Sequence, residues 1–148
     1  VGSRDTRQRV GAMSRGPRFI LDTHAALWAQ VDVARLSRRA RTAMAGLPPS
    51  GLAVCAVTLT EIARLLREGR IVPAIAEPGA WLDGFGQCFA VLPVTARVAW
   101  TAAAFDWPHR DPCDRHILAT ALVHGLPLVT FDPVIAAFAP KVGVEIVW

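Results

Sequence analysis

Short apolar runs alternate with helix-like stretches along this chain, and that alternation limits its fold more than any other feature of the sequence. Runs of strand length occupy residues 18–21, 52–57, 89–92 and 126–131, and a stretch with helical spacing follows each of them. Alternating strands and helices are typical of βαβ units, which build a parallel sheet with helices on its faces. The pattern therefore predicts an α/β fold around a short parallel sheet, with residues 142–148 as a further edge strand.

Capping residues mark where several of the expected helices begin and end. Ser37 has the form of a helix cap, and Gly125 has the form of a helix terminator. Thr58 and Glu61 have the spacing of a capping box, which would place Glu61 in the first turn of its helix. The expected helices cover residues 23–30, 38–44, 95–105, 114–124 and 133–138, with others after Thr58 and around Trp81.

The length of 148 residues fits a single domain. Although 53% of the residues are hydrophobic, no apolar run approaches the ~18 residues of a membrane span, so we expect a soluble protein. The cysteines, Cys55, Cys88 and Cys113, are odd in number and lack the spacing of a zinc site. A disulfide framework is therefore not expected, and a reducing cytoplasm is the simplest location.

Basic residues are concentrated at the N-terminal end of the chain. Residues 1–18 carry five arginines and one aspartate, which account for the whole formal net charge of +4. The other residues are formally neutral together, so the charge gives little support for RNA binding by the folded part. We expect residues 1–17 to be a disordered basic leader, without the apolar segment of a secretory signal, and residues 18–148 to form the domain.

Acidic residues lie where expected strands are followed by helices. The carboxyl ends of parallel strands share one edge of the sheet, so these side chains should converge there. Converging carboxylates repel one another, and keeping them ionised requires a cation. Oxygen ligands suit Mg²⁺ or Mn²⁺, which points to metal-assisted phosphodiester chemistry. The candidate ligands are Asp22, Glu61, Asp114 and Asp132.

Each acid also has a purely structural explanation, because helix N-termini favour carboxylates. Asp22 would cap the first helix, and Asp111 and Asp132 each precede a proline, which suits the first position of a helix. Capping alone does not require acids at four strand ends, since serine, threonine and asparagine also serve. Capping and metal binding are compatible roles for the same carboxylates.

Other candidate sites are weaker. No phosphate-binding Gly-Lys-Ser/Thr sequence and no complete dinucleotide fingerprint occurs, so a nucleotide cofactor is unsupported. The four histidines lack the spacing of a zinc site. His109 and Arg110, just before Asp111, are candidate phosphate contacts, although a solvated loop is the simpler interpretation.

Four segments together resemble the PIN-domain ribonucleases, and more narrowly the VapC-type toxins of bacterial toxin–antitoxin pairs. The segments are residues 21–28 (LDTHAALW), 56–63 (AVTLTEIA), 109–115 (HRDPCDR) and 125–132 (GLPLVTFD). Their order and spacing match the family from about residue 19 to residue 148. Cys113 replaces the aromatic residue usual before Asp114, and Thr60 replaces a common tryptophan, but neither change removes a candidate ligand.

The resemblance implies a PIN-like three-layer α/β/α sandwich and an endoribonuclease, dependent on Mg²⁺ or Mn²⁺, that cuts RNA with metal-activated water. Family members often form homodimers, and a VapB-like antitoxin covers their active-site groove. We expect Thr23 or Thr130 to orient a ligand carboxylate through a hydrogen bond, and Asp111 to lie just outside the ligand set. The family's four acidic positions correspond to Asp22, Glu61, Asp114 and Asp132.

Three alternatives remain open from the sequence. A catalytically silent PIN module would bind RNA or a protein partner without cutting, and the complete acidic set argues against it. Phosphotransfer and phosphoreceiver folds also cluster acids at strand ends, but they need a lysine beside the acids, and the only lysine here is Lys141. A DNA-cutting relative would use the same metal chemistry, and contacts to the 2′-hydroxyl would distinguish it.

Overall fold

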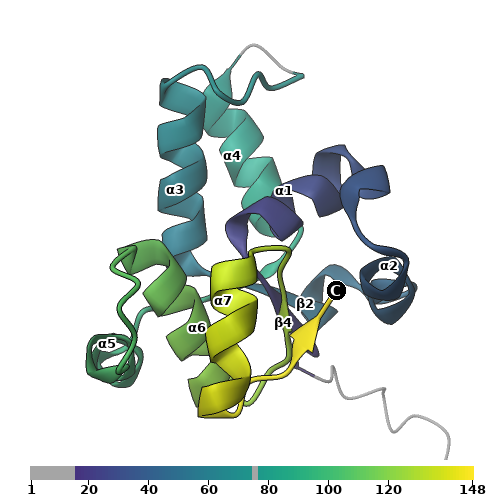
Figure 1. The fold of residues 1–148 in the computed structure, drawn as a ribbon. Coiled ribbons are helices and arrows are strands. Elements are labelled where there is room, and N and C mark those ends of the chain that lie inside the picture. Colours follow the sequence, from purple (N-terminus) through teal and green to yellow (C-terminus); the bar gives the residue numbers. More distant parts are fainter. Residues whose placement is uncertain (1–15, 75–76) are drawn as a thin grey trace, which may run out of the picture.

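The computed structural model describes residues 16–74 and 77–148, so most of the leader expected at residues 1–17 lies outside the described residues. Strands and helices alternate as the sequence predicts (Figure 1). The strands are β1 (Phe19–Leu21), β2 (Leu52–Cys55), β3 (Ala90–Leu92), β4 (Leu128–Val129) and β5 (Ile146–Val147). The helices are α1 (Thr23–Val31), α2 (Arg38–Met44), α3 (Ala56–Arg67), α4 (Pro78–Gln87), α5 (Ala96–Ala104), α6 (Pro112–His124) and α7 (Pro133–Phe138). Short 3₁₀ turns cover Val33–Arg35, Pro49–Gly51 and Ala139–Val142.

The strands form one parallel sheet in the order β3-β2-β1-β4-β5. The predicted parallel sheet is therefore confirmed, and β5 lies at an edge as expected. Because all strands run in the same direction, the segments that leave their carboxyl ends gather along one edge.

Strand side chains alternate between two cores, one on each face of the sheet. Leu21 and Val129 point into the core covered by α1 to α4, whereas Ile20 and Leu128 point into the core covered by α6 and α7. Figure 1 shows the same layering, with the strands between these two groups of helices. The predicted three-layer sandwich is confirmed.

Three predicted strands are longer than the observed ones, and local structure explains the differences. The strand expected at residues 52–57 ends at Cys55, because the buried spacing of Thr58, Ile62 and Leu65 belongs to a helix that already begins at Ala56. The capping box predicted from Thr58 to Glu61 is therefore wrong, and Cys55 occupies the cap position.

The strand expected at residues 126–131 is reduced to β4. The N–H of Leu126 bonds to the carbonyl of Ala121 at 2.9 Å, which completes the end of α6 around the left-handed Gly125. Pro127 has no N–H to donate to a neighbouring strand. The last strand is also shorter than expected, because residues 139–142 form a 3₁₀ turn.

None of the helices in the described residues combines the length and the apolar character that crossing a bilayer requires.

Candidate active site

Two of the four predicted acids leave neighbouring strands at the same edge of the sheet. Asp22 follows β1 directly and caps α1, where its Oδ1 accepts the N–H of Ala25 at 2.7 Å. Asp132 follows β4 and caps α7, where its Oδ1 accepts the N–H of Val134 at 2.8 Å. Because β1 and β4 pair in parallel, both carboxylates lie at the carboxyl edge of the sheet.

The Thr130 hydroxyl joins these two acids. It donates a hydrogen bond to Oδ2 of Asp22 and accepts the backbone N–H of Asp132, the latter at 3.0 Å. Thr130 and Asp22 expose only 1% and 5% of their surface. The hydrogen bond between them is therefore shielded from water and restrains the Asp22 carboxylate.

Glu61 reaches the same edge from α3. It lies in the second turn of the helix rather than in the first turn, and its Oε2 accepts the Thr23 hydroxyl at 2.6 Å. Thr23 is buried and directly follows Asp22, so this bond places the Glu61 carboxylate beside the start of α1. Thr23 and Thr130 thus each donate to one of the candidate ligands.

Asp114 joins the group from the first turn of α6, which Asp111 caps as predicted. Its Oδ2 lies 2.6 Å from Nε2 of His109. Both side chains are largely buried, with 18% of Asp114 and 26% of His109 exposed. His109 therefore faces the acids, contrary to the solvated loop that the sequence favoured, whereas Arg110 is exposed.

Burial is the main cause of a raised pKa at Asp22. The hydrogen bonds from Thr130 and Ala25 lower the pKa and offset part of that effect. The negative charge of Asp132 raises it further, which shows that these two carboxylates are close enough to repel each other.

The negative charges of the other acids also raise pKa values in the first turn of α6. Burial raises the pKa of Asp114 to about 6, and the charges of Asp111 and Asp132 add to the effect. Burial also raises the pKa of the Cys113 thiol to about 11, with Glu61 as the next cause. The charges of Asp132 and Glu61 thus act on the first turn of α6, which agrees with the position of the four predicted acids along one edge of the sheet.

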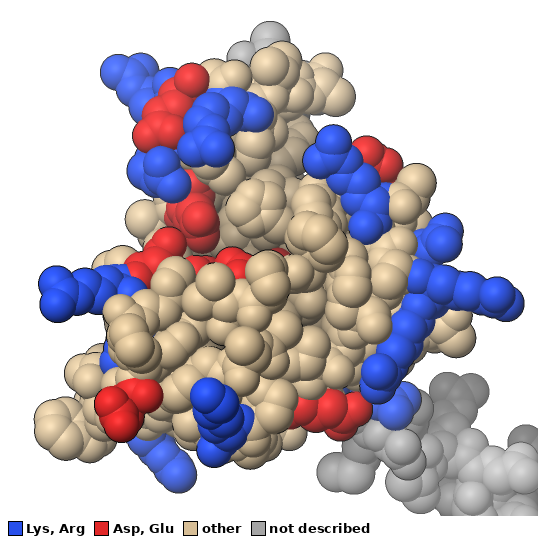
Figure 2. Space-filling view, in the orientation of Figure 1, with Lys and Arg blue, Asp and Glu red and all other residues tan. Residues whose placement is uncertain are grey.

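Among the described residues, no arginine or lysine neutralises these carboxylates. In the described part of the chain, no arginine or lysine forms an ion pair with any of the four acids, and His109 is the one ion-pair partner. In Figure 2 acidic side chains line a hollow between α3 and the α6–α7 layer. Uncompensated and partly buried negative charge fits a divalent cation with oxygen ligands.

The tightest group of candidate ligands differs in part from the predicted set. Ligand atoms of His109, Asp111 and Asp114 lie within 4.8 Å of one another, and no other such group of three occurs within residues 16–74 and 77–148. The Asp111 carboxylate is exposed and accepts the N–H groups of Cys113 at 2.9 Å and Asp114 at 3.4 Å. Asp111 is therefore occupied as a helix cap, and the predicted four acids surround the hollow at wider spacing.

Arg115 fixes the loop that carries His109, a role that the sequence did not indicate, although Arg115 ends the segment 109–115 that resembles the family. Its guanidinium donates to the carbonyl oxygens of Ala102 at 2.9 Å, Phe105 at 2.8 Å, Trp107 at 2.8 Å and His109 at 2.9 Å. The loop between α5 and α6 is thus tied to the residue that follows Asp114. A fourfold bond to backbone carbonyls has no sequence signal, because it depends on the path of the loop.

The family model of the PIN domain matches residues 19–140 of this chain. Ribonuclease VapC22 of Mycobacterium tuberculosis (strain ATCC 25618 / H37Rv) is 38% identical over 115 residues, which cover 76% of this chain and 85% of that protein.

Solved structures share the fold. DNA-bound VapBC from Salmonella typhimurium superposes with a TM-score of 0.62 at 22% identity, covering 88% of this chain and 96% of that chain. VapBC2 from Rickettsia felis, bound to a DNA fragment from its promoter, gives 0.61 at 14% identity, covering 88% and 98%. Family model, sequence identity and fold agree, and the chain therefore belongs to the PIN domain family, in its VapC branch.

Proposed function

We propose that this protein is a metal-dependent endoribonuclease and the toxin of a toxin–antitoxin pair. The observation that carries the proposal is the gathering of four carboxylates at one edge of the sheet, with no arginine or lysine partner among the described residues. The 38% identity to a protein named as a VapC ribonuclease supports RNA as the substrate.

Four carboxylates would bind the metal ion, and neighbouring side chains orient three of these carboxylates. Asp22, Glu61, Asp114 and Asp132 would bind Mg²⁺ or Mn²⁺, and the ion would supply an activated water and neutralise charge on the phosphate. Thr130 fixes Asp22, Thr23 fixes Glu61, and His109 holds one oxygen of Asp114. The helices capped by Asp22 and Asp132 stabilise the ionised carboxylates with their N-terminal dipoles.

Cleavage of defined RNA oligonucleotides by the purified protein tests the proposal. We expect cutting with Mg²⁺ or Mn²⁺ and none with EDTA. Asp114→Asn keeps the size of the side chain but removes the charge, so it should lower cleavage by about a hundredfold or more.

Asp83→Asn is the matched control, because Asp83 is an exposed acid on α4. Its cleavage rate should equal that of the wild-type protein. Full metal-dependent activity of Asp114→Asn would show that Asp114 does not carry the reaction. Equal residual activity in both variants and in EDTA would come from a contaminating nuclease and would favour a silent PIN module.

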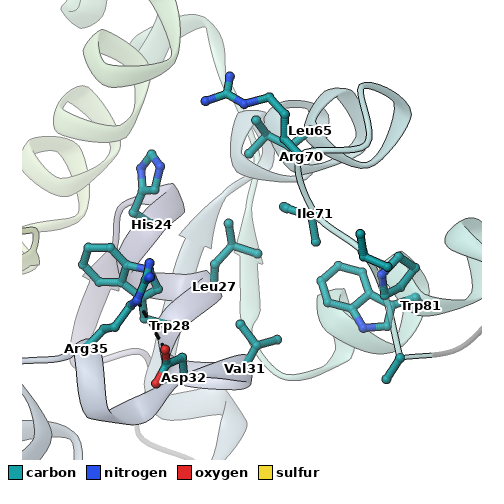
Figure 3. A pocket seen from close by; sticks show the side chains of 13 residues that line it. His24, Leu27, Trp28, Val31, Asp32, Arg35, Leu65, Arg70, Ile71 and Trp81 are labelled. Atoms are coloured by element: carbon teal, nitrogen blue, oxygen red, sulfur yellow. Dashed lines mark ion pairs between the residues drawn. The ribbon is translucent and has the colours of Figure 1, made fainter.

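A groove beside the acids fits the proposed antitoxin. A cavity of about 590 Å³ lies between α1 and the segment that follows α3 (Figure 3). Its lining includes the apolar Leu27, Val31 and Trp81. Arg35 and Arg70 also line it, and they pair with the exposed Asp32 at 3.3 Å and Glu68 at 3.9 Å, pairs that an acidic ligand would have to replace. An amphipathic segment with acidic flanks would match both features. The solved structures of VapBC complexes support a protein partner in general.

Three further parts of the proposal follow from the family resemblance. A homodimer is expected, and sedimentation of the purified protein would measure it. A cytoplasmic location agrees with the free state of the three cysteines. Residues 18–148 are proposed as the whole PIN domain, with the residues before them as a basic leader.

A further inference from the structure

A second cavity beside the acids is lined by aromatic side chains that the proposed cleavage does not use. It measures about 350 Å³, and its lining consists of Asp22, His24, Trp28, Phe131, Asp132 and Pro133. Two of these residues belong to the acidic set. A group bound in this cavity would therefore lie directly beside a phosphate held at the acids.

Phe131 presents its ring to solvent at this cavity, with 61% of the residue exposed. The ring centroid lies 5.9 Å from that of Trp28 and 5.5 Å from that of Trp148, and the two tryptophans are 5.9 Å apart. A single exposed apolar residue needs no special explanation. Phe131 differs because two other rings support it and because its cavity contains two of the acids.

The backbone fixes Phe131 relative to the acids. Its neighbours are Thr130, which bonds to Asp22 and to the Asp132 N–H, and Asp132, which caps α7. The Phe131 backbone is therefore held in a fixed position relative to the two carboxylates. A nucleic acid strand with one phosphate at the acids would bring a neighbouring nucleotide to this ring.

The chemistry of the cavity selects a flat and uncharged group. Asp22 and Asp132 would repel a second phosphate there, whereas a nucleobase carries no charge and stacks on an aromatic face. Stacking on exposed aromatic side chains is a common way to bind unpaired bases, and each stacked base contributes about fivefold to a hundredfold in affinity. A base in a duplex is already stacked and could not enter.

We propose that Phe131, supported by Trp28 and Trp148, binds an unpaired base of the RNA next to the phosphate that is cleaved. This base subsite rests on the proposed ribonuclease function and adds that the substrate must be single-stranded at the cut. Binding to this ring depends little on which base is present, because every base has a face that stacks.

The test combines three variants with abasic RNA. Phe131→Ala should raise KM for a single-stranded oligonucleotide about tenfold with little change in kcat, and Phe131→Trp should restore KM. Trp100→Ala is the matched control, because Trp100 is an aromatic residue with 74% exposure on α5. Removing one base beside the mapped cut should raise KM about tenfold for the wild-type protein. The same abasic substrate should not raise KM further for Phe131→Ala.

Equal KM values for Phe131→Ala and Trp100→Ala would overturn the base subsite while cleavage by the wild-type protein would keep the ribonuclease. Binding of fluorescein-labelled RNA in EDTA, measured by anisotropy, tests the base subsite without requiring cleavage. RNA binding that depends on Phe131 without metal-dependent cleavage would support the subsite and refute the nuclease. Equal loss on the abasic substrate in wild type and Phe131→Ala would assign the ring to another role, such as a protein interface.

Discussion

At the scale of single residues, the acidic site works against the stability of the metal-free protein. Asp22 and Asp114 have raised pKa values because burial disfavours their charged forms. Below about pH 4 the Asp114 carboxyl is protonated in both the folded and the unfolded chain. Between pH 4 and its folded pKa of about 6, only the folded form retains the proton. The free energy of unfolding therefore falls as the pH rises through this window.

We predict that Asp114→Asn raises the thermal stability of the metal-free protein above pH 6. The substitution removes a buried charge, and after allowance for solvent screening the gain should be about 1 kcal/mol, or ~3 °C in melting temperature. The gain should shrink towards pH 4, where the wild-type carboxyl is protonated. Thermal unfolding followed by circular dichroism in EDTA at several pH values measures the difference in melting temperature between the two proteins.

Addition of Mg²⁺ or Mn²⁺ provides the control for this prediction. The ions should stabilise the wild-type protein more than Asp114→Asn, because they bind the folded acidic site. A variant that melts below the wild type in EDTA at pH 7.5 would show that the Asp114 charge stabilises the fold.

The sequence could predict where the acids lie in the fold, because caps and strand ends are local features. Asp111 and Asp132 precede prolines at helix starts, and the structure has both as caps. The inward position of His109 could not be predicted, because it depends on tertiary contacts with Trp107, whose ring centroid lies 4.8 Å away, and with Asp114. The shared hydrogen bonds of Thr130 likewise arise only once β1 and β4 are paired.

At the scale of elements, the segment between α5 and α6 decides how Asp114 is presented. Arg115 binds four carbonyl oxygens of α5 and this loop, including that of His109. Trp107 and Phe138 stack with their ring centroids 4.7 Å apart, which ties the loop to α7 as well. Arg115 is thus a positioning residue, since it contacts the partner of Asp114 and not the carboxylate itself.

We predict that Arg115→Met lowers metal-dependent cleavage about tenfold, because the released loop no longer holds His109 against Asp114. The concentration of Mn²⁺ needed for half-maximal cleavage should rise, and saturating Mn²⁺ should restore part of the activity. Arg115→Lys retains the charge but not the planar fork, so its effect should be intermediate.

Arg97→Met is the control, because Arg97 is an exposed arginine on α5. Loss of activity in Arg115→Met with an unchanged Mn²⁺ requirement would indicate general destabilisation of the fold in place of a positioning role.

Element boundaries show where sequence reasoning reached its limit. The existence and order of the strands followed from apolar runs, but Ala56 and Val57 fit a strand and a helix equally well by composition. Contact of Val57 with the core beneath α6 and α7, and the burial of Thr58, resolved the choice in favour of α3. Such a decision depends on what each face of the helix meets, which a single sequence does not state.

At the scale of the whole molecule, charge separates the basic N-terminal residues from the rest of the sequence. Within residues 16–74 and 77–148, the two cores on the faces of the sheet consist of residues from Phe19 onward. The arginines before residue 18 supply most of the net positive charge, whereas residues 19–148 are formally neutral. Long-range attraction of RNA should therefore come mainly from the N-terminal residues.

We predict that a chain of residues 18–148 melts within about 2 °C of the full chain, since no core residue is removed. Its RNA affinity should depend less on salt, because each lost phosphate contact lowers the slope of log K against log salt by about 0.7 for a single strand. Anisotropy titrations at several salt concentrations measure the slope. An unchanged slope would mean that the folded part makes all the phosphate contacts, and a lower melting temperature would move the domain boundary.

Trp28 and His24 form a wall that is common to the two cavities beside the acids, the larger groove and the smaller aromatic one. A mutation that frees a toxin from its antitoxin changes the surface to which the antitoxin binds. If the groove binds the antitoxin and Phe131 binds a base, replacing Trp28 would also remove the ring that supports Phe131. A variant of Trp28 that weakens antitoxin binding would therefore also bind its RNA substrate more weakly. Inhibition by the antitoxin and nuclease activity would then both depend on this one side chain, so a mutation could not change the first without changing the second.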